Sequence, residues 1–400
     1  MQLHADDATV EAFRQEYRTW LAANRPTAAD LADAPLSTGH IPEWARAWQQ
    51  QQFDAGWLMP AWEPARGGRN ATPSEEMAYF EELARSEVQR TANSQGLVVV
   101  APALLAYGDE RQKAEFAIPT LRAERSWCLG ISEPGAGSDL GSLSTSADVL
   151  EDHFVVNGQK IWTSGALHAD YCWCLVRTDR EARRHAGISV LMIDMRSDGI
   201  SCRPIGELDD PRHADFNEVF FTDVVVPREN LVGTLNEGWA IAMGSVSRDR
   251  VLMWLSDLTT IERNAARLRE LAPRPAPGGG RWGEDARYRA RIGAHYVDAL
   301  AMRCMSHRGI SEYSRGLVSP VQSVLKIFGA ETAQRMYLDA LDFLGPVAFE
   351  RDEAATPTMG GWGASWAVDY LLSFVGTVGG GTVEIQRNII AQHVLGLPRR

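Results

Sequence analysis

The chain has 400 residues, of which 45% are hydrophobic and 23% are charged. This composition is typical of a globular protein with more than one packed unit, and it excludes a disordered or fibrous chain. The 52 acidic residues outnumber the 40 basic ones and give a formal net charge of −12, so we expect no nucleic-acid partner. The longest apolar run, 97–107, is interrupted by Pro102 and is too short to cross a bilayer, so we expect no membrane segment.

The N-terminus, the cysteines and the histidines predict a cytoplasmic protein without a metal site. The first residues, Met1–Asp7, lack the basic and apolar regions of a signal peptide. The five cysteines are odd in number and no pair has C-x-x-C spacing, so we expect them to be reduced and mostly buried. The nine histidines are scattered without the spacing of metal ligands.

The first part of the chain, 1–125, carries hydrophobic residues at helical spacing. The stretch 8–23 contains an apolar stripe formed by Val10, Phe13, Tyr17, Trp20 and Leu21. Further helices are predicted over 77–84 and 97–107. We therefore expect an N-terminal helical domain.

The next part, 126–235, changes to short strand-like runs. Three of them cover 171–176, 188–195 and 219–226. Before these runs, Asn157-Gly158 separates two strand-like stretches, which is the strongest short-range signal for a hairpin turn. Because no long helix stands between the runs, we expect an antiparallel β-barrel or sandwich domain here.

A helical period returns in the last part, 236–400. One stripe of a long helix is formed by Trp239, Met243, Val246, Trp254, Leu258, Ile261, Ala265 and Leu268. The proline- and glycine-rich run 273–280 interrupts this pattern. Further helices are expected over 284–314, 319–344 and 363–376. The plan is an α+β fold in which helices, strands and a C-terminal helical bundle follow one another.

The segment 130–139, Gly-Ile-Ser-Glu-Pro-Gly-Ala-Gly-Ser-Asp, combines glycines with two hydroxyl groups. Small residues allow backbone N–H groups to approach a ligand closely, and hydroxyls can donate to phosphate or carbonyl oxygens. The segment is a weak match to a Rossmann fingerprint, because Gly141 comes one residue late and no βαβ unit follows. On composition alone, a loop at a domain joint is the simpler interpretation.

Further motifs complete a resemblance to acyl-CoA dehydrogenases. They include Asn-Gly-Gln-Lys-Ile-Trp-Thr-Ser at 157–164 and Gly-Gly-Thr-Val-Glu-Ile-Gln-Arg-Asn at 380–388. The remaining matching segments are 107–113, 218–227 and 236–239. Together with 130–139, these motifs extend the resemblance over essentially the whole chain. The resemblance implies a C-terminal four-helix bundle, and it implies FAD bound between the β-domain and the C-terminal helices.

The resemblance also assigns residues to the cofactor. In such proteins the backbone at Ile131 and the Ser132 hydroxyl would contact the pyrimidine edge of the flavin. Gly137 and Ser138 would face the pyrophosphate.

Three more residues would lie around the flavin ring on the same grounds. Trp162 would flank the isoalloxazine, Ser164 would hydrogen-bond near N5, and Thr382 would meet the cofactor from the C-terminal side. For Trp162 the alternative is an ordinary core tryptophan at the end of a strand.

The implied reaction needs a carboxylate to remove the α-proton of an acyl thioester and a donor to polarise the thioester carbonyl. The N–H of Gly380 matches the family's donor. Many members carry their catalytic glutamate at this same position, where a glycine cannot act as a base. A minority carries it on the long helix before an arginine, and the matching residues are Asp249 and Arg250. The alternatives for Asp249 are a structural ion pair and an exposed helix edge.

The resemblance therefore implies an FAD-dependent dehydrogenase acting on an acyl-CoA or acyl-carrier thioester, with electrons passing to an electron-transfer flavoprotein. The apolar late helices predict an oligomer, either a dimer or a tetramer. Asp342 stands where many members place a glutamine toward the partner's FAD, which leaves open an unlike partner chain. The two alternatives are a non-catalytic subunit of a mixed oligomer and an oxidase on the same fold.

Overall fold

The computed structural model describes residues 7–86, 88–208, 214–276, 279–313, 321–350 and 365–398, except for the side chains of Asp7, Ala84, 245–256, Ile310 and Tyr313. Its contacts divide the chain into two compact units. The sheet unit comprises Tyr17–Thr72 and Val88–Asp249. The helical unit comprises Met1–Glu16, Pro73–Glu87 and Arg250–Arg400. Each unit has its own hydrophobic core.

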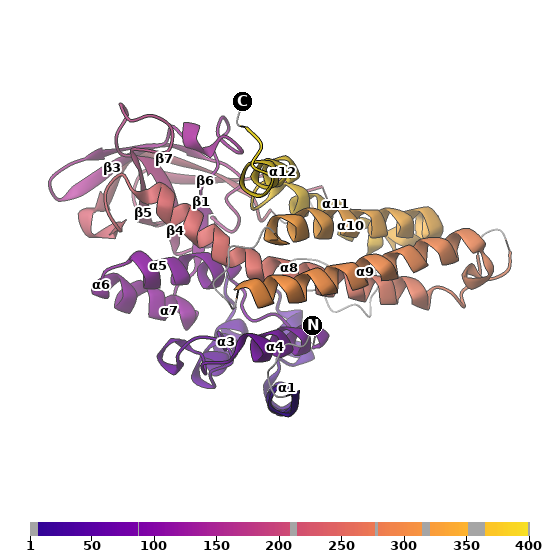
Figure 1. Cartoon of the computed structure of the whole chain (residues 1–400). Coiled ribbons are helices and arrows are strands. Elements are labelled where there is room, and N and C mark those ends of the chain that lie inside the picture. The colour runs from indigo at the N-terminus through magenta and orange to yellow at the C-terminus, as the bar shows by residue number, and fades with distance from the viewer. Residues whose placement is uncertain are drawn as a thin grey trace. The chain divides into compact units, whose positions relative to one another are not determined.

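The sheet unit contains an eight-stranded sheet (Figure 1). Its strands are β1 (Trp127–Gly130), β2 (Ser146–Val149), β3 (His153–Lys160), β4 (Tyr171–Arg177), β5 (Ile188–Asp194), β6 (Ile200–Pro204), β7 (Asn217–Pro227) and β8 (Leu231–Val232). The order across the sheet is β6-β7-β3-β2-β4-β5-β8, and β1 pairs with β4 outside this path. Most pairs are antiparallel, as predicted, but β1–β4 and β2–β4 are parallel.

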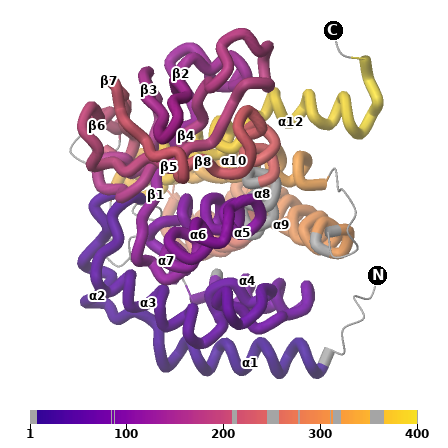
Figure 2. Tube along the Cα trace, turned by 90° about the vertical axis from the view of Figure 1, so that its left-hand side faces the viewer, coloured from indigo at the N-terminus to yellow at the C-terminus, as the bar shows by residue number. Residues whose placement is uncertain are grey.

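Both faces of the sheet are buried at its central strands β4 and β5. On β4, Cys172 and Cys174 belong to one core cluster, whereas Trp173 and Leu175 belong to the other. This alternation follows from the two-residue period of a strand. The 3-10 helices of this unit are η1 (Pro64–Arg66), η4 (Leu140–Ser142) and η5 (Arg228–Asn230). The α- and π-helices that lie wholly within this unit are α2 (Ala28–Ala32), α3 (Glu43–Asp54), η2 (Gln95–Val100), α5 (Ala101–Tyr107), α6 (Glu110–Gln112), η3 (Lys113–Ala117) and α7 (Ile118–Leu121). Leu104 and Phe116 from these helices join the cluster of Trp173, and both views show α5, α6 and α7 beside the sheet (Figure 1 and Figure 2).

The hairpin predicted at Asn157-Gly158 is wrong, because both residues lie inside β3. The chain turns earlier, between β2 and β3, where the Leu150 N–H donates to the His153 carbonyl at 2.9 Å. At Gly158 the register with β7 shifts, and φ is +149°. A Cβ at Gly158 would stand only 2.6 Å from the Thr145 Cα. Gly158 therefore allows a close backbone approach at a point where the register with β7 shifts.

In the helical unit the helices α9 (Ala286–Tyr313), α10 (Val321–Leu344) and α11 (Trp366–Val378) run side by side (Figure 1). The other α-helices of this unit are α4 (Pro73–Arg85) and the short α12 (Val383–Ile389), while α1 (Asp7–Asn24) and α8 (Gly238–Glu270) contribute to both units. The stripe predicted on the long helix is confirmed where side chains are described, because Leu258, Ile261, Ala265 and Leu268 are buried in this core. Within the described ranges, no helix combines the length and the apolarity needed to cross a membrane.

Candidate functional site

The glycine-rich segment forms the connection between β1 and β2 in the sheet unit. It leaves β1 at Gly130, whose parallel partner on β4 is Cys174. A Cβ at Gly130 would stand 2.7 Å from the Cys172 sulfur, so the close approach of β1 to β4 requires a glycine here. The start of the loop is thereby held tightly against the centre of the sheet.

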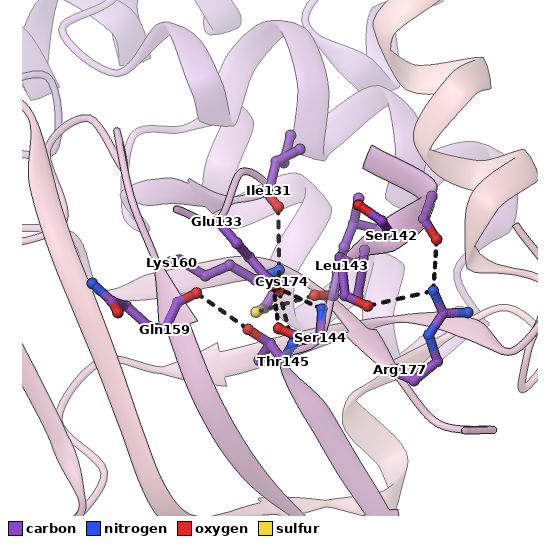
Figure 3. A network of polar contacts seen from close by, with 12 residues as sticks. Ile131, Glu133, Ser142, Leu143, Ser144, Thr145, Gln159, Lys160, Cys174 and Arg177 are labelled. Atoms are coloured by element: carbon purple, nitrogen blue, oxygen red, sulfur yellow. Dashed lines mark hydrogen bonds and ion pairs between the residues drawn. The ribbon is translucent and has the colours of Figure 1, made fainter. Parts of the chain in front are cut away.

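Glu133 anchors the loop through the polar contacts of its carboxylate, as the close-up shows (Figure 3). One carboxylate oxygen, Oε2, accepts from the Ser144 N–H at 2.7 Å and the Ser144 hydroxyl at 2.8 Å. The other, Oε1, accepts from the Thr145 N–H at 2.8 Å and from Lys160 Nζ at 2.9 Å. The Lys160 ammonium also donates to the Ile131 carbonyl at 3.2 Å. A single carboxylate thus ties both ends of the loop to the end of β3.

Both members of this ion pair are buried, Lys160 completely and Glu133 with 6% exposure. Burial on its own would raise the pKa of Glu133. The charge of Lys160 and the hydrogen bonds from Thr145, Lys160 and Ser144 outweigh that effect and lower the pKa to about 2. The carboxylate therefore stays ionised at any pH at which the protein would work.

Beyond this anchor the loop opens to solvent. Glu133 and Ala136 exchange two backbone hydrogen bonds of 3.0 Å, and Ala136 is buried. Gly137 and Ser138, in contrast, are exposed. A Cβ at Gly135 or Gly137 would meet no heavy atom within 4 Å. The loop therefore presents small residues and backbone N–H groups on a rigid base, which is what close approach to a phosphate requires.

Arg177, at the end of β4, holds the second half of the loop. Its guanidinium donates to the carbonyl of Gly141 at 2.8 Å and to that of Ala186 at 2.7 Å. A third bond reaches the Arg184 carbonyl at 2.9 Å. One side chain thus fixes two neighbouring connections of the sheet.

The segment after β3 presents Trp162 and Ser164 in a turned conformation. Trp162 has φ of +60° and is 58% exposed, and its ring meets Phe216 edge-on at 6.0 Å. The alternative of a core tryptophan is therefore wrong. Thr163 is fully buried, and its Oγ1 has no hydrogen-bond partner among the described residues. Ser164 is half-buried, so its hydroxyl lies close to the surface.

In the helical unit, Gly380 and Thr382 lie between α11 and α12. Gly380 has φ of +65° and Gly381 has φ of +94°, which only glycine adopts without strain. The Thr382 side chain accepts from the Ile385 N–H at 3.2 Å and caps α12. The glycine turn is thus fixed by a helix cap directly after it.

The proposed catalytic pair, Asp249 and Arg250, belongs to α8. Their side chains lie outside the described residues, so their direction is not part of the site geometry.

Sequence reasoning missed Glu133, Lys160 and Arg177 as positioning residues. A signal for Lys160 was present, because it shares the side of β3 that carries the buried Phe154 and Val156. A charged residue on a buried strand face must be paired. Its partner could not be found by spacing, because Glu133 comes 27 residues earlier along the chain.

Comparison with known proteins finds relatives along nearly the whole chain. Family models match for the acyl-CoA dehydrogenase N-terminal domain over 7–124, the middle domain over 128–224 and the C-terminal domain over 236–395. The acyl-CoA dehydrogenase IpdE1 of Mycobacterium tuberculosis is 34% identical over 397 residues, which cover 98% of each chain. Two solved structures match 100% of both chains. The ChsE4–ChsE5 complex from Mycobacterium tuberculosis has 29% identity and a TM-score of 0.82, and the Tcur3481–Tcur3483 steroid ACAD has 26% identity and a TM-score of 0.80.

Proposed function

The chain belongs to the acyl-CoA dehydrogenase family, and we propose that it uses FAD to convert an acyl-CoA thioester into its trans-2-enoyl thioester. The observation that carries the proposal is the loop 131–145. It is anchored by Glu133 at its base and is open at Gly135 and Gly137. A rigid loop with small exposed residues suits a bound pyrophosphate.

The described residues of the sheet unit fit FAD on three counts. At Gly137 there is open space for phosphate oxygens, and the exposed backbone N–H groups and the Ser138 hydroxyl can donate hydrogen bonds to them. Trp162 offers an exposed indole that can cover a planar ring. The Thr163 hydroxyl is buried and has no hydrogen-bond partner among the described residues. Because buried polar groups are normally hydrogen-bonded, a polar atom of the cofactor is expected beside it. When bound, FAD supplies the acceptor for the hydride that leaves the β-carbon.

We assign the α-proton transfer to Asp249. Gly380 has no side chain with which to take a proton, and Asp249 followed by Arg250 matches the family's other place for the base. In this assignment the Gly380 N–H donates to the thioester carbonyl, where negative charge develops.

Asp249→Asn tests the base directly. The purified proteins are mixed anaerobically with acyl-CoA, and loss of flavin absorbance is followed. We expect reduction to slow by at least about 100-fold, the low end for a positioned general base, while the flavin content is kept. Glu262→Gln is the matched control, because Glu262 lies on the same helix and pairs with Arg303 at 2.7 Å. Equal rates in Asp249→Asn and the unmodified protein would place the base elsewhere.

The substrate and the electron acceptor are tested in the same assay. One relative is described as a steroid ACAD, so the panel pairs straight-chain and branched acyl-CoAs with a CoA thioester of a steroid side chain. The thioester that bleaches the flavin fastest defines the substrate class. We propose an electron-transfer flavoprotein as acceptor. Rapid oxygen consumption by the reduced protein would instead identify an oxidase.

One observation favours a second candidate, a subunit of a mixed oligomer. The Asp342 carboxylate, at the place where many members direct a glutamine to the partner's FAD, accepts from Arg291 at 2.9 Å within its own chain. The chain would then rely on an unlike subunit for part of the cofactor site. Light scattering together with flavin stoichiometry separates the two cases. One FAD per chain in a homo-oligomer that oxidises a thioester would exclude the mixed assembly.

A further inference from the structure

The Glu133–Lys160 pair is directly connected to the backbone that would meet the flavin. Lys160 Nζ donates to the Ile131 carbonyl at 3.2 Å. Ile161, the first residue after β3, donates its N–H to the Ser132 carbonyl at 3.0 Å. Two consecutive carbonyls of the loop are therefore held by Lys160 and Ile161, at the end of β3.

These bonds determine where the N–H of Ser132 points. The Ile131–Ser132 peptide is trans, since the described chain has no cis bonds, so its N–H is directed opposite to its carbonyl. The carbonyl faces Lys160, and the N–H faces away from the ion pair. A charged donor on the carbonyl also makes the N–H of the same peptide a stronger donor, because neighbouring hydrogen bonds polarise one another.

Glu133 and Lys160 are the two ionised side chains at this point of the sheet. The thiols of Cys172 and Cys174 lie beside them, and Cys174 is visible next to the pair (Figure 3). A hydrogen bond with the Cys128 thiol, together with complete burial, raises the pKa of Cys172 well above its usual value, although the bond with Cys174 lowers it. The hydrogen bond with Cys172 and complete burial raise the pKa of Cys174 well above its usual value. The thiols are therefore neutral, and the net charge of the cluster depends on the ion pair alone.

We propose that Glu133 and Lys160 are positioning residues for the pyrimidine edge of the flavin, and that their balanced charges set the reduction potential of the bound FAD. The proposal rests on the proposed function, because it takes Ile131 and Ser132 as the flavin contact. Two-electron reduction places negative charge on the pyrimidine half of a flavin, so the local net charge acts on the potential.

The two single variants predict shifts of opposite sign. Glu133→Gln leaves the buried ammonium uncompensated, so the midpoint potential should move to more positive values. Lys160→Met leaves the buried carboxylate, so the potential should move to more negative values. A purely structural role would move both variants in the same direction or in neither. The potential is measured against a reference dye during anaerobic reduction, with no thioester present.

The double variant Glu133→Gln/Lys160→Met separates charge from positioning. It restores the neutral balance, so its potential should return toward that of the unmodified protein. It also removes the donor to the Ile131 carbonyl, so FAD should bind about tenfold more weakly or worse, as for loss of a charge-assisted hydrogen bond. Because no buried charge is left without a partner, this variant tests the positioning even where a single variant does not fold.

The matched control is the Arg180–Asp148 pair, which lies 2.8 Å apart on the exposed side of the same sheet unit. Asp148→Asn/Arg180→Met should change neither the potential nor the FAD affinity. Unchanged FAD affinity in the double Glu133/Lys160 variant, or equal shifts of potential in the two single variants, would overturn the inference while leaving the proposed function intact. An unmodified protein that binds no FAD would overturn both.

Discussion

Replacing Glu133 by glutamine measures how much the buried ion pair contributes to stability. The pKa of Glu133 falls from its ordinary 4.5 to about 2, because Lys160 and four hydrogen bonds favour the carboxylate more than burial opposes it. At about 1.4 kcal/mol per pH unit, this difference corresponds to about 3 kcal/mol of unfolding free energy. Glutamine imitates the protonated acid, so Glu133→Gln should lose that amount at pH 7.

Because the pKa of Glu133 is lowered in the folded state, its contribution to stability depends on pH in a defined direction. The folded state holds the lowered pKa, so the stabilisation is complete above pH 4.5 and disappears as the pH falls toward 2. The difference in unfolding free energy between the unmodified protein and Glu133→Gln should therefore be constant from pH 7 to about 5 and shrink below it. The assay is urea unfolding followed by tryptophan fluorescence, at several pH values with the same excess of FAD.

Asp148→Asn is the control for this measurement, because Asp148 forms an exposed ion pair with Arg180. Such pairs contribute about 0–1 kcal/mol, so the control should unfold almost like the unmodified protein. A loss below about 1 kcal/mol in Glu133→Gln at pH 7, or a loss that stays constant down to pH 3, would refute the reasoning.

The remaining predictions concern backbone strain, a second carboxylate and the loop. Gly158→Val should lower the unfolding free energy by about 2–4 kcal/mol in urea, because its Cβ would stand 2.6 Å from the Thr145 Cα; a variant as stable as the unmodified protein would contradict this close approach. Burial raises the pKa of Asp257 to about 6 despite the charge of Lys326, so stability should fall as the pH rises from about 4 to 6. Asp257→Asn should remove this fall and raise the melting temperature at pH 8 but not at pH 4; equal effects at both pH values would argue against it. Arg177→Met should reduce the FAD content of the purified protein, because the carbonyls of two connections lose their donor, and full occupancy would show that the loop holds without it.

The sequence alone determined the local elements of this protein. The apolar stripe through Leu258, Ile261 and Leu268 predicted the buried face of α8, because a helix repeats every 3.6 residues and its pattern is visible within one segment. The strand-like runs at 171–176 and 188–195 likewise became β4 and β5. The order of the motifs was enough to place the whole chain in its family.

The tertiary structure decided what depends on contacts between distant residues. Asn157-Gly158 has the local signature of a turn, yet both residues lie inside β3, where Gly158 approaches Thr145 closely and the register with β7 shifts. The parallel pairing of β1 with β4 has no mark in either segment, because their register is set across the sheet. Lys160 contacts Glu133 only in the folded protein, where the loop 131–145 lies against β3. Because both charges are buried there, each needs the other as a partner. Hydrophobic periodicity can be recognised within one segment of the sequence. Strand register, close backbone approach and charge pairing depend on two segments that meet only in the folded protein.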